Sequence, residues 1–391
     1  MKKAAALLVC VGLAGLAQDD PTPLRERAAA LAAAGKYAEA EPIFSHALDL
    51  QEQELGAEDP RLAPLLGALA AVYRAQGRNP EAEKLYLRAL AIQQKAAGEW
   101  SAELIPDLKV LAGLYAAMAR FSEAERQYLR VIAIRERAKG TEDLDLANDS
   151  TELAGFYIAR KRYAVAEPNL RRAIYIIERK LGPEDPSLVP VLDNLATVLM
   201  EQQNYGPAEA PLRRAVSIEE RAYGPNHVNV APHLDKLAML FYIEKRYADA
   251  TPLYQRSLPI WESAMGPDSG ELVTALDNLA VVYASQGKFA DAAPLYQRSL
   301  ALRQKSAVLS ANNLALVLEG KGDHAAAERQ YRQAISLAEK IPSLAGAASV
   351  GESELLAKTL ANYATLLRKL KRNVEAAKVE ARAKALAKGD Q

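Results

Sequence analysis

Residues 278–302 read NLAVVYASQGKFADAAPLYQRSLAL, and their apolar side chains recur with the period of an α-helix. From Leu276 to Tyr283 apolar residues stand at i, i+3, i+4 and i+7, which places them on one helical stripe. The Gln-Gly-Lys sequence at 286–288 interrupts this pattern, and glycine suits the C-terminal cap of a helix. A second stripe then runs from Ala292 to Leu302. The stretch therefore predicts two helices joined by a tight turn.

The same pattern recurs along the chain with a period of 42 residues. Its marker is a leucine–alanine pair, found at Leu69-Ala70, Leu111-Ala112, Leu153-Ala154, Leu195-Ala196, Leu237-Ala238 and Leu279-Ala280. A degenerate unit starts at Arg27, and two later units start at Leu314 and Tyr363, after intervals of 35 and 49 residues. Repetition at this period indicates a repeat array of nine units. Each unit is too small to bury its own apolar face, so neighbouring units must stack.

The links between units contain signals that start a helix. Asp185 and Pro186 in the link GPEDP, and likewise Asp59 and Pro60, suit an N-cap followed by the first helical residue. No run alternates between apolar and polar residues, which a half-buried strand would require. We therefore expect an all-α fold of about nine antiparallel helix pairs.

These residues resemble a known family. The order of Leu-Ala, Tyr, Gly, Ala, Tyr and Leu in residues 278–302 resembles a tetratricopeptide repeat (TPR), and the 42-residue spacing with LG-x-x-DP links resembles its kinesin light chain subtype. The resemblance covers residues 27–386. It implies a right-handed superhelical solenoid in which the first helix of each pair lines a concave groove, but it does not imply a particular partner. We expect this groove to bind a protein or peptide.

The domain boundaries follow from this repeat. The N-terminus has the pattern of a signal peptide over residues 1–17, with Lys2 and Lys3 before a short apolar stretch and a small-x-small site ending at Ala17. We expect export, to the periplasm or outside a bacterial cell; the alternative is a cytosolic protein with an apolar tail. Cleavage after Ala17 would also remove Cys10, leaving no cysteine. A short linker is expected at 18–26, a regular array at 27–313, and irregular units with a capping helix at 314–391.

Composition and motifs favour a protein without enzymatic activity. The chain has 49 basic and 49 acidic residues, and this balance disfavours nucleic acid as a partner. Of its four histidines, His227 and His233 lie six residues apart, on different helical faces, so no metal site is expected. Phosphate-binding glycine loops and a nucleophile elbow are absent from the sequence, so we expect neither a cofactor nor catalytic residues. No segment is long and apolar enough to predict a transmembrane helix.

The strongest functional signal lies at the residue before each leucine–alanine pair. In the later units this residue is Asn194, Lys236, Asn278, Asn313 or Asn362. An amide can donate and accept hydrogen bonds at once, which suits the backbone of an extended peptide. In the kinesin light chain family, asparagines that match this position hold peptide backbones. The earlier units depart from the pattern with Ala68 and Val110, which places the expected site in the C-terminal half.

Two further features extend this hypothesis. Asp193, Asp235 and Asp277 adjoin these positions and would make the groove partly acidic, which favours a basic or amine-bearing segment. Met239 and Tyr242 would provide apolar anchors. The predicted contact residues are thus Asn194, Asp235, Lys236, Met239, Tyr242, Asp277, Asn278 and Asn313. The sequence leaves open the partner, the oligomeric state, and whether the groove is no more than a family feature without a ligand.

An alternative site lies on the second helices. Arginine occupies one position in six units, at Arg88, Arg130, Arg172, Arg214, Arg256 and Arg298. These residues could form a cationic convex ridge of an assembly factor in a cell-envelope or secretion complex. Glutamates such as Glu136 and Glu220 stand near the ridge, which favours a solvated face with ion pairs instead.

Overall fold

A computed structural model describes residues 21–341 and 350–388, and every regular element in these two ranges is helical. The predicted signal peptide and residues 342–349 of the expected irregular units lie outside the described residues. The chain divides into two compact units, residues 1–191 and 192–391.

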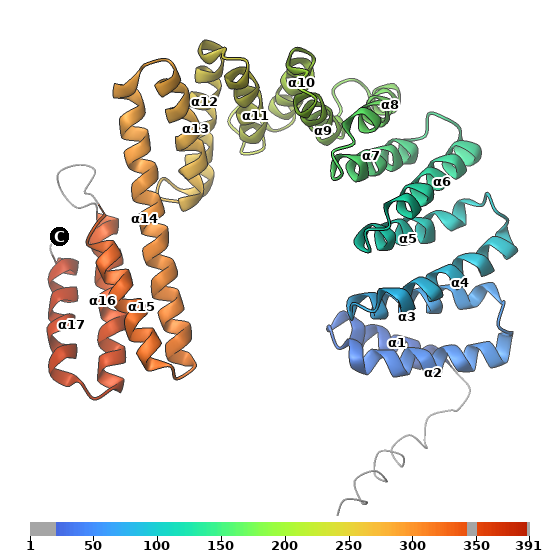
Figure 1. Cartoon of the computed structure of the whole chain (residues 1–391), viewed down its shortest axis with the longest axis horizontal. Coiled ribbons are helices and arrows are strands. Elements are labelled where there is room, and N and C mark those ends of the chain that lie inside the picture. Colours follow the sequence, from blue (N-terminus) through green and yellow to red (C-terminus); the bar gives the residue numbers. More distant parts are fainter. Residues whose placement is uncertain (1–20, 342–349, 389–391) are drawn as a thin grey trace, which may run out of the picture. The chain divides into compact units, whose positions relative to one another are not determined.

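The N-terminal unit is built from antiparallel helix pairs, coloured blue to green in Figure 1. Its helices are α1 (Pro21–Ala33), α2 (Tyr37–Leu55), α3 (Ala63–Ala75), α4 (Asn79–Ala97), α5 (Ile105–Ala117), α6 (Phe121–Lys139), α7 (Leu144–Ile158) and α8 (Tyr163–Leu181), with 3₁₀ turns η1 (Pro60–Leu62) and η2 (Ala102–Leu104). Helix α9 (Leu188–Glu201) begins in this unit and continues into the next.

The C-terminal unit continues the series of pairs. Its helices are α10 (Tyr205–Tyr223), α11 (Val230–Ile243), α12 (Tyr247–Met265), α13 (Val273–Ser285), α14 (Phe289–Gly320), α15 (His324–Ala338), α16 (Val350–Lys369) and α17 (Asn373–Lys388), with the turn η3 (Gly270–Leu272) before α13. The expected all-α solenoid of helix pairs is therefore confirmed. The described residues hold 17 α-helices and not 18, because α14 serves two successive pairs.

The core consists of contacts within and between pairs. In the first pairs, Phe44 and Leu48 of α2 share one apolar cluster with Leu69 and Val72 of α3. The alanine that opens each second-helix stripe, such as Ala82, is buried in every regular unit, and its small size lets the helices approach closely. Burial of one unit by the next is thus the main source of stability.

The local signals for helix ends act as expected, with one variation. Asp59 caps the turn η1 by accepting a hydrogen bond from the backbone N–H of Arg61 at 2.9 Å. Gly287 ends α13 in the left-handed conformation at φ +75°. In other units the same turn is made by residues such as Ala119 (φ +58°) and Lys245 (φ +60°), which have a side chain in that conformation.

Two predicted boundaries differ from the structure. Helix α1 already begins at Pro21, so residues 21–26 of the expected linker are helical; proline is well suited to the first turn of a helix. The expected boundary between the regular and irregular units, at 313/314, lies inside α14. No glycine or proline occurs between Pro294 and Gly320, so nothing stops that helix.

Candidate partner-binding site

An ion-paired cluster joins α9 to α11 in the C-terminal unit. Lys236 Nζ donates to Asp193 Oδ2 at 2.6 Å, and Nδ1 of His233 lies 3.1 Å from Asp193 Oδ1. Burial disfavours the ionised form of Asp193, but the hydrogen bonds from His233 and Lys236 outweigh it and hold the pKa of this carboxyl below its ordinary value. Lys236, a predicted contact residue, therefore has its charge balanced within the chain.

Asp235 contacts α12 instead of solvent. Ser257 Oγ donates to one of its carboxyl oxygens, and Trp261 Nε1 donates to the other at 2.8 Å. Burial raises the pKa of Asp235 above its ordinary value, although these two hydrogen bonds oppose the change. Because both oxygens are engaged, this predicted contact residue serves as a polar link between α11 and α12.

The amides of Asn194 and Asn278 remain available. Both residues are half-buried, and their side chains form no hydrogen bond with any other residue that the structure describes. Asp277, next to Asn278, forms an ion pair with Arg303 of α14. The two asparagines therefore keep open donors and acceptors beside carboxylates that are already paired.

Apolar side chains lie on the same side of α11. Met239 is 51% exposed, and the half-buried ring of Tyr242 packs against Tyr247 with centroids 5.6 Å apart. Met239 and Tyr242 follow Lys236 at i+3 and i+6, so one side of the helix presents all three. We call the set Asn194, Lys236, Met239, Tyr242 and Asn278 the first-helix face.

Asn313 is not brought to this face. It is exposed on the C-terminal part of α14, ten residues beyond Arg303, which contacts Asp277. Ten helical residues correspond to about 15 Å. Asn313 lies away from α13 because α14 continues without a break, which the sequence pattern did not reveal.

The expected acidic character of the face is largely cancelled. Lys236 pairs with Asp193, Arg303 pairs with Asp277, and Asp235 is turned toward α12. These three carboxylates therefore give the first-helix face little electrostatic preference for an amine-bearing segment. Hydrogen bonding by amides and apolar contact are the chemistry that this face offers.

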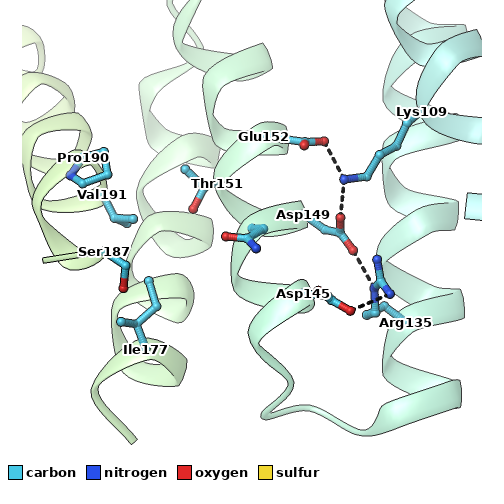
Figure 2. A pocket seen from close by; sticks show the side chains of 11 residues that line it. Lys109, Arg135, Asp145, Asp149, Thr151, Glu152, Ile177, Ser187, Pro190 and Val191 are labelled. Atoms are coloured by element: carbon cyan, nitrogen blue, oxygen red, sulfur yellow. Dashed lines mark hydrogen bonds and ion pairs between the residues drawn. The ribbon is translucent and has the colours of Figure 1, made fainter. Parts of the chain in front are cut away.

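The N-terminal unit contains a pocket that sequence analysis did not identify. Its volume is about 470 Å³, and charged side chains of α5, α6 and α7 line one wall. Figure 2 shows Asp149 between Lys109 and Arg135. Lys109 Nζ lies 2.6 Å from Asp149 Oδ1, and Arg135 Nε donates to Oδ2 at 2.9 Å. Glu152 and Asp145 pair with the same two cations at 2.9 and 3.0 Å. Lys139, which does not line the pocket, also pairs with Asp145 at 3.0 Å, so each of the three carboxylates has a cationic partner.

One sequence signal could have revealed this cluster. Asp149 and Ser150 occupy repeat positions held by Leu65 and Leu66 in the unit that begins at Leu69. The side chain of Asp149 is only 2% exposed. A carboxylate at a core position requires a cationic partner, but the identity of that partner depends on tertiary contacts.

The arginines of the second helices are also paired. Arg88 contacts Glu52, Arg172 contacts Glu136, and Arg256 contacts Glu220, each at 2.5 Å. Each pair connects the second helices of successive units. This arrangement agrees with the interpretation as a solvated face with ion pairs, and it leaves the guanidinium groups less available to an anionic partner.

The described part of the chain comprises residues 21–341 and 350–388. No helix there combines the length and the apolar character needed to cross a membrane. Within the same ranges, no group of three or more His, Cys, Asp or Glu side chains is placed to hold a metal ion.

Helix pairs stacked through their apolar faces, with no strand in the described residues, define a helical repeat scaffold of the kind that binds other proteins. The family pattern described as tetratricopeptide repeat matches residues 19–95, 65–137, 145–221 and 230–305, and a second pattern of the same description matches residues 308–341. The chain belongs to the tetratricopeptide repeat family, as its sequence predicted. Such chains are scaffolds for protein–protein interactions.

Several solved structures are similar to the chain at low sequence identity. BtubC (BKLC) from P. vanneervenii is 22% identical, covering 58% of this chain and 90% of its own, with a TM-score of 0.49. A Podosopora anserina protein named for kinesin light chain and nearly identical TPR-like repeats is 24% identical, covering 52% and 99%, with a TM-score of 0.46. A tetratricopeptide repeat protein from Parabacteroides merdae is 15% identical, covering 87% and 98%, with a TM-score of 0.43. Comparison with curated proteins found no match.

The buried carboxylate of the pocket should be essential for stability. Asp149→Ala leaves Lys109 and Arg135 partly buried without their shared partner, which should lower the free energy of unfolding by about 3 kcal/mol. Asp145→Ala, which removes a half-exposed carboxylate of the same cluster, should cost less than about 1 kcal/mol. Urea denaturation followed by circular dichroism measures both, and equal losses would contradict this assignment.

The cluster around Asp193 should make stability depend on pH. Because the folded-state pKa of Asp193 is lowered, its ionised form stabilises the fold above the unfolded value of about 3.9, and this contribution is lost as the pH falls through the folded-state value. The stability difference between the natural chain and Asp193→Asn should therefore be largest near neutral pH and shrink in acid. Denaturation at several pH values measures it, with Asp291→Asn, an exposed carboxylate on α14, as the control for lost charge. A difference that grows toward acid pH would refute the expectation.

Proposed function

We propose that the chain is a non-enzymatic scaffold that binds an extended segment of a partner protein along the first-helix face. The observation that carries the proposal is the pair of amides, Asn194 and Asn278, whose side chains have no hydrogen-bond partner among the described residues. In the kinesin light chain repeats that this chain resembles, the matching position lies on the inner side of the array, which supports the proposal.

The polar contacts would come from the two amides. A peptide in extended conformation presents N–H and C=O groups in turn, and one asparagine side chain can satisfy both. Lys236 and Asp193 already neutralise one another, so the face can accept an uncharged backbone without leaving a buried charge unpaired.

The apolar contacts would come from α11. Met239 is 51% exposed between the two asparagine positions in the repeat order, and methionine adapts its shape to different partners. Tyr242 adds an aromatic surface beside it. These side chains favour a segment with an apolar residue between hydrogen-bonded backbone groups.

The test is binding of peptides selected against the full chain from a random display library. Asn194→Ala together with Asn278→Ala should weaken binding of the selected peptides roughly tenfold or more, because several hydrogen bonds worth about 1 kcal/mol each are lost. Asn169→Ala, a half-buried asparagine on α8 whose amide already donates to the carbonyl of Val165, provides the matched control. Fluorescence anisotropy measures affinity, and circular dichroism verifies that helicity is retained.

The alternative is binding through the convex ridge, as in an assembly factor of a cell-envelope or secretion complex. If the double asparagine variant binds normally while Arg172→Glu with Arg214→Glu abolishes binding, the ridge is the site and the first-helix face is not. The ion pair of Arg172 with Glu136 makes that outcome the less favoured one.

We also propose that the protein acts after export, with residues 1–17 removed as a signal peptide. The charged start, the apolar stretch and the small residues at Gly15 and Ala17 support this. N-terminal sequencing of protein recovered from its native compartment should find Gln18 as the first residue. An intact Met1 would refute cleavage and favour the cytosolic alternative.

A further inference from the structure

Exposed apolar side chains are concentrated on α14. Among the described residues, 17 large hydrophobic side chains are exposed, and seven of them lie on this helix. They are Phe289, Tyr296, Leu300, Leu309, Leu314, Leu316 and Val317. Such a concentration on one helix is unusual for a protein that works as a single chain.

The regular junctions show what normally covers these positions. Where the first pair meets the second, Phe44 and Leu48 of α2 are 4% and 7% exposed, because Leu69 and Val72 of α3 belong to the same cluster. The later repeats have the same burial, since Tyr254 and Leu258 of α12 and Leu279 and Val282 of α13 are all at most 8% exposed. In each junction, a second-helix face and the following first-helix face bury one another.

The corresponding positions on α14 are uncovered on both sides. Tyr296 and Leu300, which match Tyr254 and Leu258 one repeat later, are 41% and 51% exposed. Leu314 and Val317, which match Leu279 and Val282, are 46% and 54% exposed. Leu314 is the predicted start of a unit, but it is exposed, whereas the leucine that starts the preceding unit, Leu279, is buried. We call these two surfaces the donor face (Tyr296 and Leu300) and the acceptor face (Leu314 and Val317).

The continuity of α14 separates the two faces. At the preceding junction Gly266 ends α12 at φ +86°, whereas the matching residue here is Val308, which is helical and fully buried. Leu300 and Leu314 are 14 residues apart on one helix, a separation of about 21 Å. Figure 1 shows α13 beside one end of α14 and α15 beside the other. The two faces therefore cannot cover each other within the described conformation.

We propose that a second copy of this chain covers both faces in a swapped dimer. The donor face of one copy would pack against the acceptor face of the other, and the reverse contact would form at the same time. Each contact would then reproduce a junction that this chain already uses between its other repeats. Exchange of identical elements between copies is a low-cost route to a closed dimer with twofold symmetry.

The polar positions of this junction suit pairing between identical chains. Arg298 of α14 pairs with Glu262 of the preceding second helix. One repeat later, the positions of Glu262 and Arg298 are held by Gln304 and Gln333. Two amides can hydrogen-bond in either direction, so the new contact would contain no unpaired charge. The proposal does not depend on the peptide site, because neither Asn194 nor Asn278 belongs to these faces.

The first test is the mass of the full chain in solution, by light scattering after size exclusion. The natural chain should be a dimer, and Leu300→Glu should raise its dissociation constant about a hundredfold, because the substitution acts in both symmetric contacts. Leu129→Glu, a leucine on α6 that is 48% exposed, should leave the dimer intact. A monomeric natural chain, or equal effects of the two variants, would overturn the proposal.

The second test separates exchange between copies from closure within one. Phe44 and Val72 line one cavity at the first junction, so their counterparts Tyr296 and Val317 should be close in the swapped dimer. In a chain with Cys10→Ser, Tyr296→Cys and Val317→Cys, a short bismaleimide should link two copies covalently. Two chains that carry one cysteine each should also be linked after they are refolded together. A link within a monomer would show that α14 folds back on itself, and that result or the absence of a link would overturn the proposal.

Discussion

The structure depends on the burial of each second-helix face by the first helix of the next unit. Leucine and aromatic side chains such as Phe44, Leu48 and Tyr254 become buried only when that neighbour is present. Burial of one such side chain contributes about 1.5–3 kcal/mol, and several are buried at each junction. Because a single pair has no other way to cover this face, stability increases unit by unit along the array.

The same junctions determine which charges remain free. Ion pairs of 2.6 to 2.8 Å connect glutamates of one unit to arginines of the following unit. They are Glu41–Arg78, Glu83–Arg120 and Glu209–Arg246. These arginines also lie over aromatic rings, as Arg78 does over Tyr73. These ion pairs therefore help to fix the register between units. Uncharged groups, the amides and Met239, are left for recognition.

The uncovered faces of α14 follow from the same constraint. Each regular repeat of 42 residues has a glycine after its second helix, such as Gly266, where the chain reverses. The interval of 35 residues from Leu279 to Leu314 has no glycine at this position. Helix α14 therefore continues without a break. The donor face and the acceptor face still carry apolar residues, but no neighbouring helix of the same chain covers them. In the proposed swapped dimer, a second copy therefore covers these faces, while the helix pairs before and after α14 remain folded.

The sequence alone determined the helical period, the repeat length and the family, because these depend on local spacing and on turn residues such as Gly287 and Asp59. It also determined which repeat positions carry amides. Only the tertiary structure decided that Lys236 is paired with Asp193, that Asp235 is turned toward Trp261, and that Asp149 lies between Lys109 and Arg135. It likewise decided that Leu314 is exposed. The physical reason is that burial and charge pairing depend on which helix lies opposite, and in a repeat array that helix belongs to a different unit.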